Sequence, residues 1–203
     1  LDGATASLNL VGLLYETGRQ GFQGVHVMGS KNIAETAKAQ GVAHLVQMSA
    51  LGADAASTSK YARTKAEAEA EVRAIYPDAV IVRPSIVFGN GDGFFNRFAA
   101  MAQFSPVLPL IGGGKTRFQP VFVGDVGRAL AQMVTDPACA GQTYELGGPG
   151  VFTFRELLEK MLAETDQRRL LAPIPFPFAS LLGKAGNLTS FLIPPPVTSD
   201  QVE

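Results

Sequence analysis

The sequence has 203 residues, of which 46% are hydrophobic and 17% charged, a balance typical of a folded domain rather than a disordered chain. A formal net charge of −1, with basic residues scattered along the chain, argues against a nucleic-acid-binding surface. The single cysteine, Cys139, excludes an internal disulfide, and two histidines far apart in the sequence, His26 and His44, give no sign of a metal centre.

Segments with strand and helix patterns alternate along most of the chain. Strands are predicted at residues 4–11, 44–48, 79–83, 119–123 and 143–146. Helices are predicted at residues 25–40, from a cap within 57–59 to about residue 76, and at 94–104, 125–135 and 153–165. Thr153 and Glu156 have the spacing of a capping box at the start of the last helix. The alternation predicts an α/β fold with a Rossmann-like, doubly wound and mainly parallel sheet.

The composition changes at residue 170, where Pro173, Pro175 and Pro177 alternate with apolar residues. Three consecutive prolines follow at 194–196, and residues 178–192 between them have the pattern of a short apolar helix. We therefore expect a main domain at 1–169 and a Pro-rich C-terminal appendage at 170–203. Two interpretations of the appendage remain open. It either packs on the main domain or presents an apolar surface to a partner or a membrane.

One short stretch, residues 61–65, combines side chains that suit acid/base chemistry. Tyr61 and Lys65 lie four positions apart, so a helix would place them on one face, one turn apart. A lysine near a tyrosine hydroxyl favours the phenolate and can lower the pKa of the tyrosine toward the range of a general acid/base. Ser49 follows the 44–48 strand and could add a hydroxyl. Alone, a Tyr-x-x-x-Lys pair is also an ordinary surface arrangement.

Two further segments follow predicted strands directly, where open α/β sheets bind ligands. Asn9 lies in the first of them, at 9–12, and either contacts a ligand or only satisfies a turn. In the second, at 84–89, exposed backbone amides would read a carboxamide or phosphate, or the segment is an ordinary loop. Asp125, by contrast, is interpreted as the cap of the helix that follows it rather than as a catalytic carboxylate.

Nucleotide-binding signatures are absent from the sequence. Spaced glycines after a first strand, the dinucleotide fingerprint, do not occur. The Gly112–Lys115 segment resembles a phosphate loop, but Pro109 stands where that loop requires glycine. The opening residues read like the middle of a fold, since nothing before them could form a first strand and glycine-rich turn.

Together, the motifs resemble the NAD-dependent epimerase/dehydratase branch of the short-chain dehydrogenase/reductases in order and spacing. The segments that carry the resemblance are Asn9-Leu10-Val11-Gly12, Ser49, Tyr61-x-x-x-Lys65, Arg-Pro-Ser-Ile-Val-Phe-Gly at 83–89 and Gln-Pro-Val-Phe-Val-Gly-Asp-Val at 119–126. Within that branch the chain is most similar to the nucleotide-binding accessory subunit of respiratory complex I and its alphaproteobacterial relatives. The resemblance covers nearly the whole chain.

The resemblance implies a Rossmann core that binds NADP(H) or NAD(H). Tyr61 and Lys65 would lie near the nicotinamide ribose, and Ser49 would face the substrate side, which makes these three the candidate catalytic residues. The implied cofactor-binding residues are Asn9, Leu10, Val11, Gly12, Met48, Tyr61, Lys65, Pro84, Ser85 and Ile86. No metal is expected. In the family the glycine fingerprint lies on a first βαβ unit, so this chain is expected to start near the fourth strand and to expose an unpaired strand edge.

Two functions follow from the resemblance. The first is an accessory protein of complex I type in which the nucleotide is structural. It would bind other complex I subunits and, through the Pro-rich region, a membrane surface, on the matrix or cytoplasmic face of an inner membrane. The second is an active oxidoreductase, epimerase or dehydratase, cytoplasmic, acting on a nucleotide sugar or a similar carbonyl substrate with Tyr61 as general acid/base. A third interpretation is a fragment that binds no nucleotide.

Overall fold

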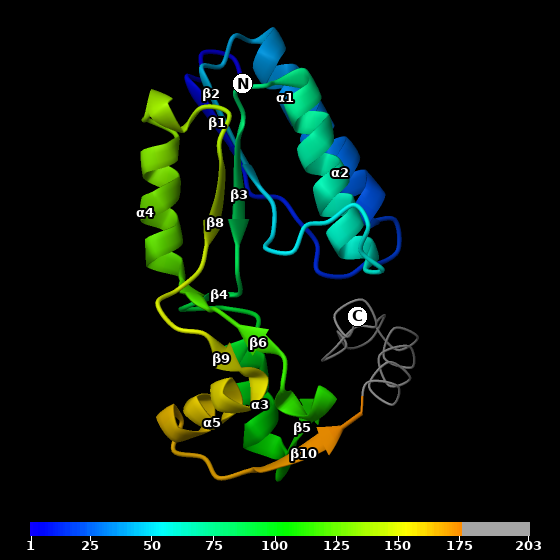
Figure 1. The fold of residues 1–203 in the computed structure, drawn as a ribbon, viewed down its shortest axis with the longest axis vertical. Coiled ribbons are helices and arrows are strands. Elements are labelled where there is room, and N and C mark those ends of the chain that lie inside the picture. The colour runs from blue at the N-terminus through cyan, green and yellow to red at the C-terminus, as the bar shows by residue number, and fades with distance from the viewer. Residues whose placement is uncertain (176–203) are drawn as a thin grey trace. The chain divides into compact units, whose positions relative to one another are not determined.

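The computed structural model describes residues 1–175, which form two compact units (Figure 1). The first unit comprises Leu1–Ser85 and Gly124–Leu146, and the second comprises Ile86–Val123 and, within the described residues, 147–175. The helix expected at 178–192 lies outside the described residues. The boundary expected at residue 170 stays a prediction, because most of 170–203 also lies outside them.

A four-stranded sheet forms the centre of the first unit. Its order is β1-β2-β3-β8 and all of its strands are parallel, which confirms the α/β fold predicted from the sequence. The strands are β1 (Ala6–Asn9), β2 (His44–Met48), β3 (Val80–Pro84) and β8 (Thr143–Leu146). No other strand within residues 1–175 pairs with the outer side of β1, where the side chain of Leu8 is exposed.

Helices cover both faces of this sheet, as the doubly wound prediction requires. Figure 1 shows α1 and α2 on one side of the sheet and α4 on the other. The helices of this unit are η1 (Gln23–Met28), α1 (Gly29–Ala39), α2 (Lys60–Ile75), α4 (Val123–Met133) and the short 3₁₀ turn η3 (Pro137–Cys139). Small and branched side chains from α1, α2, β2 and β3, among them Ala34, Val72 and Ile81, form the core beneath α1 and α2.

The start of α2 follows directly from the sequence. Ser59 is the N-cap, and its hydroxyl accepts a hydrogen bond from the amide of Ala62 at 3.2 Å. Alanine, glutamate and lysine dominate the helix, which suits their high helix propensity. The helix ends at Ile75, shortly before Pro77. The cap fixes the residue at which α2 begins, and so places Tyr61 and Lys65 in the first two turns of the helix.

Two predictions in this unit need correction. The segment predicted as one helix at 25–40 begins with a π-helical turn, η1, in which the amide of Gly29 bonds to the carbonyl oxygen of Gly24. Asp125 is not a cap, because α4 begins two residues earlier, directly after a strand, and Asp125 lies in its first turn. There it forms an ion pair with Arg128.

The second unit is built on three short strand pairs and two helices. The pairs are β4 (Val87–Phe88) with β7 (Val121–Phe122), β5 (Val107–Ile111) with β10 (Leu170–Ile174), and β6 (Arg117–Phe118) with β9 (Phe152–Thr153). The helices are α3 (Phe95–Phe104), α5 (Phe154–Glu164) and the 3₁₀ turn η2 (Gly112–Gly114). Phe98, Leu108 and Leu158 lie in the shared core. The capping box of Thr153 and Glu156 is confirmed.

The strand β10 was not predicted. Pro173 interrupts its apolar pattern, and proline is tolerated only on strands at the edge of a sheet. Among the described strands β10 pairs only with β5, so it is an edge strand, where a proline can be accommodated. Within residues 1–175, no helix is long and apolar enough to cross a lipid bilayer.

Candidate functional site

The candidate site lies in the first unit, where three neighbouring parallel strands end. β1 ends at Asn9, β2 at Met48 and β3 at Pro84, and the register of the sheet places these ends along one edge. Ser49 and the segment 10–14 follow two of these ends. Ser85 belongs to the same unit, but Ile86 is the first residue of the second unit. The predicted site residues other than Ile86 are therefore brought together by the parallel sheet and by α2.

Lys65 is a buried cation in this part of the structure. Only 5% of its surface is exposed, and its Nζ lies 5.8 Å from the centroid of the half-buried Tyr61 ring. Burial lowers the pKa of Lys65, because an ammonium group loses its hydration there, and the negative charge of Glu69 partly offsets this. No ion pair joins Lys65 to a carboxylate in the described part of the chain. The lysine is therefore poised for a ligand with hydroxyl or anionic groups.

Gly12 permits the ammonium of Lys65 to approach the backbone. A β-carbon built at this position would lie 3.1 Å from Nζ of Lys65 and 3.9 Å from Nε2 of His26. The 3.1 Å contact is tighter than most real β-carbon contacts, whereas 3.9 Å is an ordinary van der Waals distance. Leu10 and Val11, which precede it, are exposed at 53% and 57%. Hence the segment 10–12 offers backbone rather than side-chain polar groups to a ligand.

The side chain of Asn9 is buried and forms its hydrogen bonds within the protein. Its Oδ1 accepts a hydrogen bond from the amide of Val11, and its Nδ2 donates to Oε1 of Gln47 at 2.8 Å and to Oγ of Ser30 at 3.3 Å. The side chain thus fixes the turn after β1 and ties it to β2 and α1. Of the two interpretations left open by the sequence, the structure shows the turn. Contact of Asn9 with a cofactor stays a prediction.

Ser49 presents a buried hydroxyl that lacks a partner in the described structure. The residue is 4% exposed, and its Oγ makes no hydrogen bond, although its amide bonds to the carbonyl oxygen of Val82 at 2.7 Å. Leaving a buried polar group unpaired costs about 1–3 kcal/mol, so such groups call for an explanation. A bound ligand that accepts or donates one hydrogen bond would remove this cost.

The segment after β3 is more constrained than the sequence suggested. The amide of Ser85 donates to the carbonyl oxygen of Leu146 at 2.9 Å, and the carbonyl oxygen of Pro84 accepts from the amide of Leu51 at 2.9 Å. Proline itself has no amide hydrogen. The backbone amide of Ser85 is therefore occupied by the sheet. Contact of residues 84–86 with a carboxamide stays a prediction.

His26 is a functional candidate that the sequence interpretation missed. It lies in the π-helical turn η1, and 1% of its surface is exposed. Its Nε2 lies 3.0 Å from the amide nitrogen and 3.1 Å from the carbonyl oxygen of Leu13, and its Nδ1 lies 3.0 Å from Oγ1 of Thr64. Its ring stacks on Phe22 and meets the ring of Tyr61 edge-on at 5.4 Å. The residue thus joins the segment 10–14 to the helix that carries Tyr61 and Lys65.

The surroundings keep His26 neutral. Burial, and next to it the positive charge of Lys65, lower the pKa of His26 to about 4. The only sequence signal for this role is a polar, titratable side chain within an otherwise helical apolar pattern. π-Helical turns are frequent at functional sites, but nothing in the local sequence marks this one in advance.

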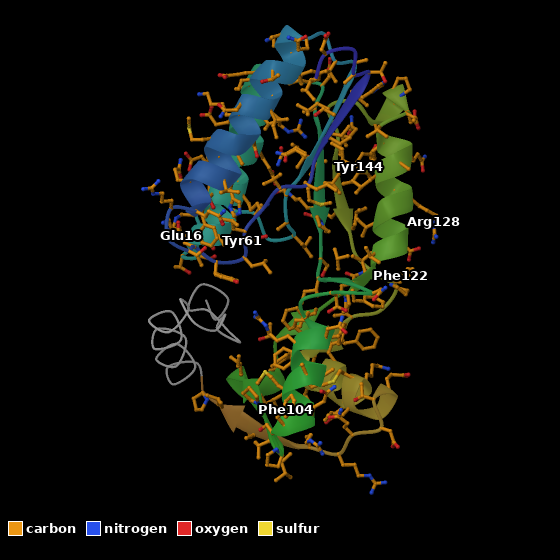
Figure 2. All side chains as sticks on the ribbon, turned by 180° about the vertical axis from the view of Figure 1, so that it is seen from behind. Glu16, Tyr61, Phe104, Phe122, Arg128 and Tyr144 are labelled. Atoms are coloured by element: carbon orange, nitrogen blue, oxygen red, sulfur yellow. The ribbon has the colours of Figure 1, made fainter. Side chains whose placement is uncertain are left out.

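The rim of the site is held by Glu16. Its Oε1 accepts a hydrogen bond from the amide of Phe22 at 2.8 Å, and its carboxylate pairs with Lys60 at 2.8 Å. The hydrogen bond from Lys60 is the largest cause of a lowered pKa of Glu16. Figure 2 shows Glu16 and Tyr61 at the same end of the helical layer of this unit. These contacts fix the segment after β1 against the first turn of α2.

A second charged group lies one turn further along α2. Glu69 receives two hydrogen bonds from Arg83, at 2.9 Å from Nε and 2.6 Å from an Nη, and Arg83 also reaches Glu145 at 3.5 Å. These contacts raise the pKa of Arg83.

No group of three or more metal-ligating side chains occurs within residues 1–175. A hollow of about 470 Å³ on α2 is lined by Gln23, Ala55, Lys60, Arg63, Thr64, Ala66, Glu67 and Ala70.

Comparison with known sequences gives a consistent result. The sequence model described as "NAD dependent epimerase/dehydratase family" matches residues 14–147. The chain is 37% identical over 201 residues to "NADH dehydrogenase [ubiquinone] 1 alpha subcomplex subunit 9, mitochondrial" from Arabidopsis thaliana, and 36% identical over 197 residues to the protein of that name from Mus musculus. The alignments cover 98% and 97% of this chain but 50% and 52% of these relatives. The chain therefore spans about half their length.

Comparison with solved structures supports the fold. The structure of MoeE5 in complex with UDP-glucose and NAD superposes with a TM-score of 0.75 at 17% sequence identity. The superposition covers 86% of this chain and 67% of the MoeE5 chain. At 17% identity this similarity shows a shared fold and no more.

Proposed function

The chain belongs to the NAD-dependent epimerase/dehydratase family, and from this membership we propose that it is an NADP(H)- or NAD(H)-binding accessory subunit of a respiratory NADH:ubiquinone oxidoreductase. The observation that carries the proposal is the 36–37% identity to complex I subunits along nearly the whole chain. The likeness extends over both compact units, so it is not confined to the nucleotide-binding motifs that many enzymes share.

The residues at the strand ends fit the nicotinamide-ribose half of a dinucleotide. Within residues 1–175, Lys65 provides a buried ammonium without an ion-pair partner and Ser49 a buried hydroxyl without a hydrogen bond, while Gly12 provides a backbone that a ligand can approach. Ribose hydroxyls accept from an ammonium and exchange hydrogen bonds with hydroxyls, so the chemistry of these groups matches. The other half of the nucleotide has no counterpart among the motifs of the sequence, since the glycine fingerprint is absent.

In this proposal the chain binds and orients the nucleotide. Lys65 would hold the ribose, Tyr61 would lie beside it, and His26 would keep the segment 10–14 in place through its bond to Leu13. A bound nicotinamide would supply hydride chemistry, which the accessory role does not require. Other complex I subunits would be the partners, and an inner membrane the location, with the protein peripheral on its matrix or cytoplasmic face.

A second candidate function is an active oxidoreductase, epimerase or dehydratase. The specific observation in its favour is that Tyr61 and Lys65 are both present and adjacent, with Lys65 in an environment that lowers its pKa. Tyr61 would then exchange a proton with a substrate oxygen, and Ser49 would orient that oxygen. The two functions differ in whether Tyr61 is needed for turnover.

The first experiment is a titration with NADPH, followed by the change in nucleotide fluorescence. Residues 1–203 are titrated alone and joined behind the N-terminal half of the Arabidopsis relative. Saturable binding by either protein supports the nucleotide site, and Lys65→Met in the same protein should abolish it. Binding by neither contradicts the nucleotide part of the proposal.

Assembly is tested separately. The joined protein is expressed in cells that lack their own copy of this subunit, and complex I is resolved on a native gel. Co-migration with NADH dehydrogenase activity, together with restored assembly, supports the accessory role. A protein that stays apart from the complex and turns over a carbonyl substrate supports the second candidate.

A further inference from the structure

Lys65 and Glu69 lie one turn apart on α2 and would ordinarily form an ion pair. Both are buried, at 5% and 8% exposed, and residues four positions apart share one face of a helix. In a buried setting the attraction between such charges is stronger than in water. The structure nevertheless shows no salt bridge between them within residues 1–175.

Arg83 explains the missing pair. Its guanidinium, on β3, donates two hydrogen bonds to Glu69, one to each carboxylate oxygen. A planar guanidinium matches the geometry of a carboxylate, so this bidentate arrangement is strong and directional. With both oxygens of Glu69 occupied, the side chain of Lys65 extends toward Gly12 and Tyr61 instead.

We propose that Arg83 is a positioning residue for Lys65: by binding the carboxylate of Glu69, it leaves the ammonium of Lys65 beside Tyr61 and over Gly12 for a ligand. The inference rests on the proposed function only for the identity of that ligand. Its core is a competition between two cations, Arg83 and Lys65, for a single buried carboxylate.

The competition has a definite consequence when Arg83 is lost. Glu69 would be a buried carboxylate without its partner, and the ammonium one turn away would be the nearest cation able to neutralise it. The charged and titratable groups that face Lys65 are Glu69 and Tyr61 on α2 and His26 on η1. Of these, Glu69 is the one that would attract it, so Lys65 would turn away from Gly12 and bind its proton more tightly.

The test measures the pKa of Lys65 directly, without a nucleotide. The protein is labelled with ¹³C-lysine, the Cε resonance is followed by NMR over pH, and Lys65→Met assigns the signal. In Arg83→Gln the pKa of Lys65 should rise by about one unit, equivalent to about tenfold tighter proton binding. In Arg83→Gln combined with Glu69→Gln it should return to or below the wild-type value, because the competing carboxylate is gone.

Arg73→Gln is the matched control. Arg73 also links α2 to β8 and the preceding loop, through bonds to Gly141 and Thr143 at 2.9 and 2.7 Å, but in the described structure it makes no hydrogen bond or ion pair with Glu69. Arg73→Gln should lower the melting temperature without moving the pKa of Lys65. A parallel titration with NADPH should show about tenfold weaker binding in Arg83→Gln and recovery in the double variant.

The outcomes separate the two proposals. An unchanged pKa of Lys65 in Arg83→Gln, or a double variant that fails to reverse the change, would overturn the inference. The expected pKa changes without NADPH binding by any protein, wild type included, would support the competition and contradict the proposed ligand. A double variant whose NADPH binding stays as weak as that of Arg83→Gln, with its fold intact, would show that Arg83 only supports the structure.

Discussion

The side chain of Lys65 lies over the backbone of Gly12, with Nζ 3.1 Å from the place a β-carbon would take. Glycine is required here for the close approach rather than for a left-handed backbone, since Gly12 is not among the residues with positive φ. The contact joins the segment after β1 to the helix that carries Tyr61. It therefore defines one wall of the candidate site.

Gly12→Ala should displace the ammonium of Lys65 by a few tenths of an ångström and weaken NADPH binding several-fold. The contacting atom, Nζ, is at the end of the flexible Lys65 side chain, which can move aside. The cost in unfolding free energy should therefore stay below about 1 kcal/mol, under the usual range for overpacking. Nucleotide titration and urea unfolding measure the two effects. Gly127→Ala on α4, where a β-carbon meets no atom within 4 Å, should leave binding unchanged. Equal effects of the two substitutions would contradict the assignment.

His26 should make the protein less stable as the pH falls. Burial first, and Lys65 next, lower the pKa of His26 from 6.5 to about 4. The unfolded chain therefore binds the proton more readily than the folded one. The stabilisation is present above pH 6.5 and is lost as the pH falls toward 4, by about 3 kcal/mol. Urea unfolding at several pH values should show this slope in the wild type and a flatter one in His26→Gln. Glu16, whose pKa is lowered from 4.5, adds a further loss only below that value.

Tyr61→Phe separates an accessory protein from an enzyme. Phenylalanine preserves the edge-on contacts with Phe22 and His26 and removes only the hydroxyl. For an accessory subunit we expect NADPH binding to weaken by a few-fold, which corresponds to one hydrogen bond of about 1 kcal/mol. Assembly into complex I should persist. NADPH-dependent reduction of a carbonyl substrate by the wild type, lost in this folded variant, would instead establish the enzymatic function.

Ser59→Ala should destabilise the start of α2. The hydroxyl of Ser59 caps the helix through the amide of Ala62, and loss of such a cap costs about 1 kcal/mol. Thermal unfolding of the variant should show the loss. The neighbouring Thr58→Ala is the control, because Thr58 contributes its backbone carbonyl oxygen, which accepts from Arg63. A similar loss in both variants would mean that the loop, rather than the cap, is being measured.

Local signals in the sequence predicted the elements that depend on local interactions. The bounds of β2 and β8, a cap of α2 within 57–59 and the capping box at Thr153 were predicted correctly, because side-chain period and capping chemistry are properties of neighbouring residues. The parallel direction of the sheet followed from the alternation of strands and helices, whereas the order of its strands was not predicted.

The features that the sequence did not predict depend on contacts between residues far apart in the chain. The π-helical turn around His26 places the ring against Leu13 and Thr64, and no local pattern encodes those partners. The same is true of Arg83, which the sequence presents only as part of an Arg-Pro motif, and whose partners lie on α2 and β8. The pairing of β10 with β5 was not predicted, because Pro173 interrupts the strand pattern of β10.

The crossing of the chain between its two units has a consequence for the order of folding. Ile81 of β3 pairs with Thr143 of β8, although all of 86–123 and α4 lie between them in the sequence. Closing so long a loop costs entropy before the contact returns any, which slows formation of that pair. During synthesis, β1, β2 and β3 can assemble first, while β8, the other neighbour of β3, is still missing. Arg83 would meanwhile lack Glu145, so the charge network beside Lys65 matures only when β8 arrives.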